Sequence, residues 1–311
     1  MSLNAALAAL NPLAGYQIRE AGPGDAADLF ILQAAIASTG AGEFLAWTQQ
    51  LEERLETGSL AWIATAGRRP VGMALIDPLP GLPGVFELNG GIIPARQRQG
   101  AGTRLLARVV ADAGAWGGNQ LSCRVDSLAG ATAGFLLRRG FFIEHEECLL
   151  ERRGLDDLPA IPTRPGDRFI SYARERAVTE FCRLYLQSFS DAPWSQPYSP
   201  DEVEETLVEA EDLLFWERDG APVGVAWLEV AEGGRARIEP IGIDRDYQGQ
   251  GFGHRLLLAA LHEFRRRGAN LVEIGLWRNN IIAMHLYQSL GFAEVANWYY
   301  LAYDLAPRPE Q

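Results

Sequence analysis

The sequence predicts two consecutive α/β domains of about 150 residues each. The first observation behind this prediction is an internal repeat. QRQGAGTRLL at 97–106 aligns with QGQGFGHRLL at 248–257, an offset of 151 residues, and at the same offset Gly140 matches Gly291. The second observation is the order of strand-like and helix-like segments, which is the same around these landmarks in both halves. The chain therefore reads as a duplication.

A stretch rich in proline and charge, ERRGLDDLPAIPTRPGDR, separates the two copies and is typical of a linker. Each copy also contains a strand-like phrase before its glycine cluster, RRPVGMALI in the first and GAPVGVAWLEV in the second. We therefore expect a first domain over 1–155, a linker over 156–168 and a second domain over 169–311.

The elements are clearest in the second copy. Their order is strand, two helices, several strands, a glycine loop, helix, strand, helix and strand, and the helix after the glycine loop carries a continuous apolar stripe. The expected strands are 213–219, 221–230, 236–244, 269–277 and 298–305, and the expected helices are 178–189, 200–210, 253–268 and 280–291.

Composition narrows the possible functions. The formal net charge of −12 argues against a general nucleic-acid binder, and no apolar run is long enough to span a membrane. Three cysteines without paired or metal-ligand spacing fit a reducing compartment, so we expect a cytoplasmic protein, monomeric or homodimeric. Three of the four histidines, His254, His262 and His285, do not cluster with acids, and no metal is expected.

The glycine cluster Gly249, Gly251 and Gly253 precedes a helix and follows a strand, a setting in which backbone N–H groups can hold a phosphate. Two familiar phosphate-binding loops do not fit. A dinucleotide-binding loop would lie early in its domain and be followed by an acidic residue on a second strand. The nucleoside-triphosphate loop requires a lysine, and all 28 basic residues of this chain are arginine.

The loop resembles instead the (Q/R)xxGxG/A loop of the GCN5-related N-acetyltransferases, or GNAT family. A second motif of that family, NxxAxxLYxxxGF, resembles the segment NNIIAMHLYQSLGF at 279–292. The resemblance implies two tandem GNAT-type domains, each a mixed and mostly antiparallel sheet flanked by helices, as also found in mycothiol synthase. The second motif is carried by Asn280, Ala283, Leu286, Tyr287, Gly291 and Phe292.

The resemblance implies acetyl-CoA as the acetyl donor. Backbone N–H groups at the helix start would face its diphosphate, because a β-carbon would hold the phosphates away. The preceding strand would pair with the pantetheine arm, and in the family it splays from its neighbour. The implied cofactor-binding residues are Ile241, Gly242, Ile243, Gln248, Gly249, Gln250, Gly251, Phe252, Gly253, His254 and Asn280.

Two residues are candidates for proton transfer. Tyr287 falls where the family has its general acid, although a tyrosine there could also simply pack in the core. Glu239 is the candidate base, because it shares strand parity with Ile241 and Ile243 and so faces the same cleft. The family's usual glutamate lies two residues earlier, where this chain has Arg237, so a salt-bridge role for Glu239 stays open.

Two further segments of the second copy have alternative interpretations. Asn280 orders the cofactor or caps the following helix, and the two roles are compatible. The aromatic and proline-rich loop at 188–200 either shapes the acceptor pocket, as in the family, or is an ordinary connection between helices.

The first copy departs from the pattern. Its loop keeps Gln97, Gly100 and Gly102, which implies a second cofactor-binding loop, but Leu136 stands where the second copy has Tyr287. A leucine cannot donate a proton, so the first copy is expected not to catalyse. Whether it binds CoA or only supports the fold stays open.

The expected function is transfer of acetyl from acetyl-CoA to a primary amine in the second copy. The acceptor is a small molecule or a peptide, including a protein N-terminus. One alternative is mycothiol-synthase-like acetylation of a cysteinyl amine on a small thiol. Another is a non-catalytic acyl-CoA sensor, favoured if Tyr287 is buried away from the cleft.

Overall fold

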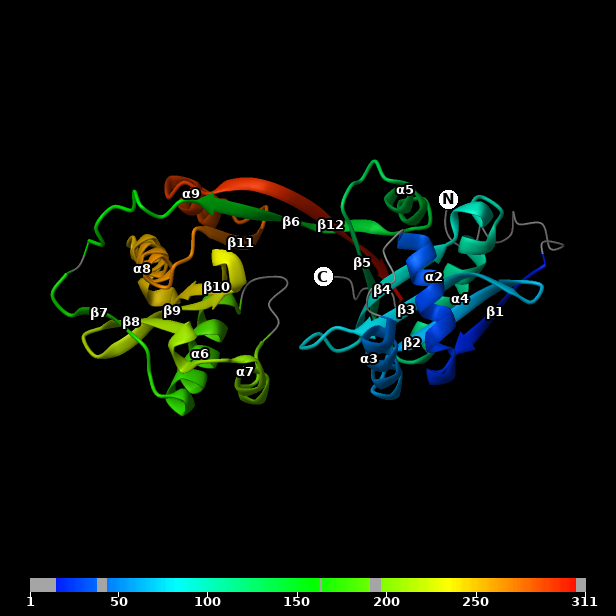
Figure 1. Cartoon of the computed structure of the whole chain (residues 1–311), viewed down its shortest axis with the longest axis horizontal. Helices are drawn as coiled ribbons and strands as arrows, with labels where there is room; N and C mark the ends of the chain where they lie inside the picture. The colour runs from blue at the N-terminus through cyan, green and yellow to red at the C-terminus, as the bar shows by residue number, and fades with distance from the viewer. Residues whose placement is uncertain (1–14, 38–43, 163, 191–196, 306–311) are drawn as a thin grey trace. The chain divides into compact units, whose positions relative to one another are not determined.

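A computed structural model describes residues 15–37, 44–162, 164–190 and 197–305. The chain divides into two compact units. The first contains the residues up to His145 together with those from Trp298 onward, and the second runs from Glu146 to Asn297 (Figure 1). Each unit contains one sheet with helices on both of its faces.

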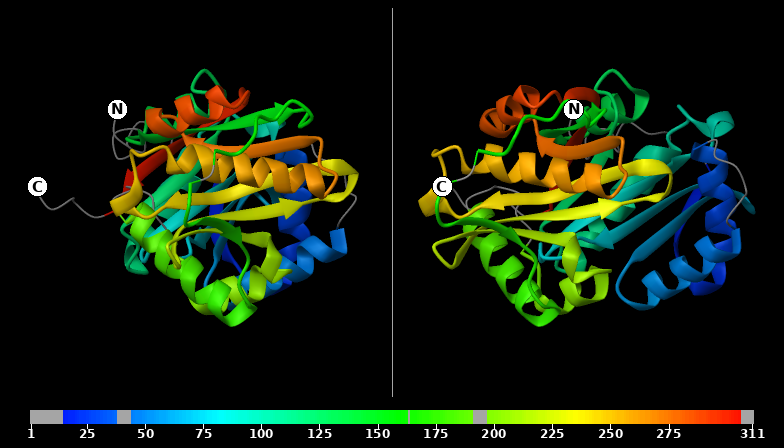
Figure 2. Two further views of the ribbon diagram at one scale, coloured as in Figure 1. Left: turned by 90° about the vertical axis from the view of Figure 1, so that its left-hand side faces the viewer. Right: turned by 60° about the vertical axis from the view of Figure 1, so that its left-hand side comes forward.

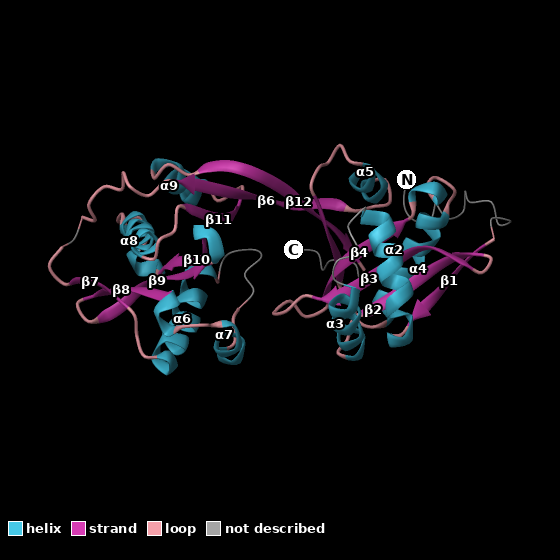
Figure 3. Ribbon diagram, in the orientation of Figure 1, coloured by secondary structure: helices cyan, strands magenta, loops and turns pink. Residues whose placement is uncertain are grey.

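The helices and strands follow the order that the sequence predicts (Figure 3). Those of the first copy are β1 (Tyr16–Ala21), α2 (Ala26–Ala37), α3 (Phe44–Glu56), β2 (Leu60–Ala66), β3 (Arg69–Pro78), β4 (Val85–Ile92), α4 (Ala101–Ala115), β5 (Gln120–Val125), α5 (Ala131–Leu137) and β6 (Phe142–Arg153). Those of the second are β7 (Asp167–Ile170), α6 (Arg174–Phe189), α7 (Pro200–Thr206), β8 (Leu213–Arg218), β9 (Ala221–Val230), β10 (Arg235–Ile243), α8 (Phe252–Arg266), β11 (Leu271–Trp277), α9 (Ile281–Ser289) and β12 (Ala293–Asp304).

The expected helix at 200–210 is shorter than predicted. Ser199 begins α7 with a capping box, accepting from the Glu202 N–H while the Glu202 carboxylate accepts from the Ser199 N–H. The helix ends early because Leu207 takes an extended conformation (φ −68°, ψ 113°) and its side chain is buried in the core.

The strands of the two units have matching orders. In the first unit the order is β1-β2-β3-β4-β5-β12, and in the second it is β7-β8-β9-β10-β11-β6. The pairs β4–β5 and β10–β11 are parallel, and the other registered pairs within each unit are antiparallel. This is the mixed, mostly antiparallel sheet that the resemblance implies.

The last strand of each copy lies in the sheet of the other unit. In the first unit β12 pairs with β5, from Tyr299 opposite Val125 onward, and in the second β6 pairs with β11 over all seven residues of that strand. The division therefore differs from the expected boundaries at 155 and 169, because β6 beyond His145 belongs to the second unit and β12 from Trp298 to the first. Figure 1 shows β6 reaching β11 and β12 reaching β5.

Each sheet separates two apolar cores. In the second unit α8 and α9 pack on one face, around Leu256, Leu257 and Tyr287, and α6 and α7 pack on the other, around Phe181 and Val203 (Figure 2). In the first unit α4 and α5 cover one face and α2 and α3 the other. The segment expected as a linker packs as well, since His262 Nε2 contacts the Pro159 carbonyl at 2.8 Å.

Candidate active site

The glycine loop of the second copy connects the end of β10 to the start of α8. Gln248 folds back and donates from Nε2 to the Ile243 carbonyl at 2.9 Å. Gly251 occupies the N-cap position with φ 78°, in the left-handed region that favours glycine. No side chain caps the helix, and a β-carbon on Gly251 would meet no atom within 4 Å. The first-turn N–H groups of α8 are therefore available to an anion.

The first copy builds its loop in the same way. Gln97 donates to the Ile92 carbonyl at 2.9 Å, and Gly100 is the N-cap of α4 with φ 90°. Arg98 has a positive φ of 62° where Gly249 has 73°. A left-handed arginine costs about 1–2 kcal/mol, yet the backbone keeps this geometry. The two loops therefore have one conformation despite their different residues.

Strand β10 leaves its parallel neighbour before it reaches the loop. Its pairing with β11 covers Arg235 to Ile238 alone, whereas its pairing with β9 continues to Ile243. The edge of β10 that faces β11 is therefore free over 239–243, and this is the splayed strand that the family resemblance implies. In the first copy, β4 likewise pairs with β5 only over Val85–Glu87.

A bulge in β10 corrects the expected orientation of Glu239. The register with β9 shifts between Ile238 and Ile241, so one extra residue interrupts the alternation of side chains. Ile241 and Ile243 consequently pack into the core beneath α8, whereas Glu239 lies over Gly275 on the opposite face. The expected shared parity is wrong. Pro240, which cannot donate a ladder hydrogen bond, is the sequence signal for such a bulge.

Tyr287 lies on α9 with 6% of its surface exposed. Its ring packs 6.0 Å from that of Phe292, centroid to centroid. Burial, and to a smaller extent the negative charge of Glu239, raises the pKa of the phenol above the ordinary tyrosine value. The first copy has buried Leu136 at this position.

Glu239 forms an ion pair on the strand itself. Arg237 donates from Nε to Glu239 Oε2 at 2.7 Å, and both side chains are about half exposed. The carboxylate lies beside Gly275 on β11, where a β-carbon would be 3.6 Å from Oε2, an ordinary van der Waals contact. A pair this exposed contributes about 0–1 kcal/mol to stability, so it neither requires nor excludes a chemical role for Glu239.

The remaining predicted residues divide into two groups. Asn280 caps α9, accepting from the Ala283 N–H at 3.1 Å, and His254 lies half-buried in the first turn of α8. Phe252 is 2% exposed and packs against Trp216 at 4.5 Å, so only its backbone can face a ligand. Ile243 is the last residue of β10, and the predicted cofactor-binding residues 248–254 run from the loop that follows it into the first turn of α8.

Aromatic side chains gather on the face of the sheet that carries α6. Phe181 meets Trp227 edge-on at 5.1 Å, and Tyr185 meets Tyr198 in the same manner at 4.8 Å. Burial, followed by the charges of Tyr185 and Glu239, raises the pKa of Tyr198 to about 12. Residues 191–196, the middle of the loop expected to shape the acceptor pocket, lie outside the described residues.

Two regions of the chain, 31–141 and 178–292, match the model of the acetyltransferase (GNAT) family. Together they cover more than half of the 311 residues, and each contains one glycine loop. The chain belongs to the GNAT family. It is therefore an acetyltransferase with two GNAT regions in tandem.

Other proteins share this plan. The mycothiol acetyltransferase of Mycolicibacterium smegmatis is 28% identical over 240 residues, which cover 74% of this chain and 79% of that protein. A solved GNAT structure from Sphaerobacter thermophilus is 18% identical with a TM-score of 0.67, covering 97% of this chain and 99% of that one. A tandem GNAT protein from the clavulanic acid biosynthesis pathway is 19% identical with a TM-score of 0.61, covering 94% and 100%. These two structures support the GNAT fold.

None of the helices in the described ranges is both long and apolar enough to cross a membrane. No group of three or more histidine, cysteine, aspartate or glutamate side chains in the described part of the chain could hold a metal ion.

Sequence reasoning missed a buried ion pair behind the second GNAT loop. Arg255, on the first turns of α8, contacts Asp167 at 3.3 Å and donates to the Gln250 carbonyl at 3.4 Å. The Asp167 side chain is 1% exposed and that of Arg255 8%. At the repeat offset of 151 residues, Asp167 aligns with Tyr16, so the first copy has no such carboxylate. The pair ties the loop backbone to the first residue of β7.

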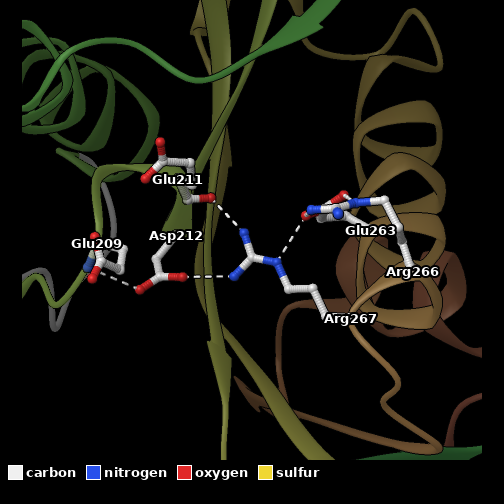
Figure 4. A network of polar contacts seen from close by, with 6 residues as sticks. All are labelled: Glu209, Glu211, Asp212, Glu263, Arg266 and Arg267. Atoms are coloured by element: carbon white, nitrogen blue, oxygen red, sulfur yellow. Dashed lines mark hydrogen bonds and ion pairs between the residues drawn. The ribbon is translucent and has the colours of Figure 1, made fainter.

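Replacing Arg255 with glutamine is expected to weaken CoA binding about tenfold. The carbonyl of the peptide group between Gln250 and Gly251 loses its donor, so the Gly251 N–H in the same peptide plane loses its fixed direction. Calorimetric titration with CoA measures this weakening. Arg267→Gln is the matched control. Arg267 forms an ion pair with Asp212 at 2.6 Å at the other end of α8 (Figure 4), so its loss costs stability without touching the loop. Equal CoA affinity in the two variants would contradict the prediction.

Proposed function

We propose that the second GNAT copy binds acetyl-CoA and transfers its acetyl group to a primary amine, and that the first copy does not catalyse. The observation that carries this proposal is the free edge of β10, which leads from the bulge at Glu239 to the uncapped start of α8. A strand edge without a partner suits an extended pantetheine arm, and an uncapped helix start suits a diphosphate.

The residues of this chain fit that donor. Backbone N–H groups from Gln250 to Gly253 hold the diphosphate, and the edge at 239–243 pairs with the pantetheine arm. When bound, acetyl-CoA supplies a thioester whose carbonyl carbon accepts the amine. Gly251 supports this fit, because the space beside its α-carbon is open to solvent.

Two side chains move the protons. Glu239 accepts a proton from the attacking ammonium group, directly or through water, so that the nitrogen can form the new C–N bond. Tyr287 donates its phenolic proton to the sulfur as the C–S bond breaks, and the thiol leaves neutral. The second proton that the nitrogen loses on becoming an amide returns to the Tyr287 phenolate, so the phenol is restored. The raised pKa of the Tyr287 phenol keeps this proton in place at neutral pH. The first copy has Leu136 instead, and its strand β4 pairs with β3 without a bulge.

A second candidate is a mycothiol-type acceptor, in which the amine belongs to a cysteinyl group on a small thiol. The name of the relatives favours this acceptor class. Arg237 argues for a different acceptor, since it occupies the position of the family's usual glutamate. Screening cysteinyl amines beside simple primary amines, with release of free thiol as the readout, distinguishes the two.

Gly251→Val tests the donor site. We expect loss of CoA binding by the second copy, because a branched side chain at the N-cap would stand between the phosphates and the backbone. Gly268→Val is the matched control. Gly268 follows α8 with φ 83° and also has open space beside it, so the backbone strain is the same and only the position differs. A folded Gly251→Val protein that binds as many CoA molecules per chain as the wild type, with the same affinities, would refute the proposal.

A further inference from the structure

The first unit contains a cavity of about 320 Å³ between the sheet and the helices α2 and α3. Its volume falls within the range of small-molecule pockets, about 300–1,000 Å³. Its lining is about equally polar and apolar: Gln33, Arg54 and Asn89 supply the polar groups, and Ile36, Trp47, Met73 and Leu75 supply the apolar surface. The proposed function gives this cavity no role.

The two copies differ in the residue that stands beside this cavity. In the aligned phrases RRPVGMALI and GAPVGVAWLEV, Leu75 corresponds to Trp227; Leu75 pairs with Ala61 on β2, and Trp227 pairs with Leu213 on β8. The Trp227 ring packs against that of Phe181 on α6, with 5.1 Å between the centroids. The two units therefore have the same strand pairing here and differ in the size of the side chain, leucine on β3 and tryptophan on β9.

The cavity reaches the free stretch of β4. This strand pairs with β5 only as far as Glu87, and Asn89 and Gly90, which line the cavity, come directly after that point. The stretch continues toward the loop at Gln97 and Gly100, which is built as in the second copy. A CoA bound along this path brings its thioester to the mouth of the cavity.

The charges favour a neutral occupant. Arg54 donates from Nε to Asp77 at 3.0 Å, and Asp77 also accepts from the Ser59 hydroxyl at 2.6 Å. The charge of Arg54 is therefore already compensated, and the other lining residues are apolar or uncharged. A hydrocarbon chain meets this lining without leaving a buried charge unpaired.

We infer that the first copy is a binding site for an acyl-CoA with a chain longer than acetyl, and that this chain lies in the cavity beside Leu75. The inference rests on the proposed mode of CoA binding and extends it to the copy that does not catalyse. Because Leu136 cannot donate a proton to the sulfur, the bound thioester is retained rather than consumed. The first copy then reports the supply of acyl-CoA.

The test uses the full chain with Gly251→Val, so that calorimetry reports the first copy. We expect hexanoyl-CoA to bind at least about tenfold more tightly than acetyl-CoA, because burying the four additional methylene groups is favourable. Adding Leu75→Trp restores the residue type of the second copy and should abolish the preference while acetyl-CoA affinity stays within about twofold. Ile36→Phe narrows the same cavity from α2 and serves if Leu75→Trp does not fold.

Four results would overturn the inference. Equal affinities for the two thioesters would show that no chain is buried, and a preference that survives both filled variants would place the chain elsewhere. If the wild type binds the thioesters and Gly251→Val binds neither, the second copy is the site of binding and the first copy does not bind acyl-CoA. The proposed function would then stand and the inference would not. A wild-type protein that binds neither thioester would overturn the proposed function as well.

Discussion

Replacing Tyr287 with phenylalanine is expected to lower turnover about 10²–10⁴-fold, the usual contribution of general acid–base catalysis. Acetyl-CoA affinity should stay within about twofold, because the ring keeps its place beside Phe292 and only the proton donor is lost. The measurement is steady-state release of free thiol with an acceptor found by screening, together with calorimetry for acetyl-CoA.

Tyr247→Phe is the matched control, since Tyr247 also packs its ring in this core, 5.8 Å from Phe252. It should retain turnover. Full turnover in Tyr287→Phe would remove the phenol from the mechanism. Weakened binding without a change in turnover would make Tyr287 a cofactor-positioning residue. A wild-type protein that binds CoA but releases no thiol with any amine would favour the alternative of a non-catalytic acyl-CoA sensor.

The pH profile gives a further check on Tyr287. Burial raises the pKa of its phenol above the ordinary value near 10, so the group remains a proton donor throughout the alkaline range below that value. Below about pH 10, loss of the Tyr287 proton should therefore not lower turnover. Any alkaline decline in this range should be present in Tyr287→Phe as well. A decline nearer neutral pH that disappears in this variant would contradict the raised pKa.

The fold could be predicted because its landmarks are local. Glycine spacing, apolar periodicity and the shared offset each depend on a few neighbouring residues, and the loop conformations at Gln97 and Gln248 match as the repeat implies. Residues carried over from the motifs also lie on the expected elements. Asn280 is the N-cap of α9, as its place before an apolar run indicates.

Features that depend on distant partners could not be predicted in this way. The ion pair of Asp167 and Arg255 joins residues 88 positions apart, and neither stands in a motif that names its partner. The orientation of Glu239 depends on one additional residue in the ladder, which simple alternation does not register. The cavity is lined by Leu75, a residue as apolar as the tryptophan at the corresponding position of the second copy, so the apolar pattern does not indicate it.

The exchange of β6 and β12 between the two units could not be predicted from the sequence for a related reason. β6 and β12 are apolar enough to join either sheet, and the hydrophobic pattern of a strand does not state which edge it will pair with. In the structure Cys148 and Leu150 of β6 enter the core of the second unit, and Leu301 of β12 enters that of the first. One core of each unit thus includes residues from both halves of the sequence.

The second copy alone, residues 169–311, is therefore expected not to fold as a monomer. Without β6, strand β11 loses its antiparallel partner, and the core loses two fully buried side chains, Cys148 and Leu150. Truncating one buried leucine costs about 2–5 kcal/mol, and the whole stability of a domain is only about 5–15 kcal/mol. The fragment also loses Arg152, which donates to the Leu290 carbonyl just after α9.

Cutting the chain between Pro162 and Arg164 is the control for this truncation. The cut breaks the backbone but keeps both β6 and β12 in the sample. An inserted protease site allows the cut to be made after folding. The two fragments should co-elute in size-exclusion chromatography and separate only in denaturant, since β6 still pairs with β11 and β12 with β5. If 169–311 were a soluble monomer with a cooperative melt, β12 would have to fill the vacant edge of β11, and the exchange would not be needed for folding.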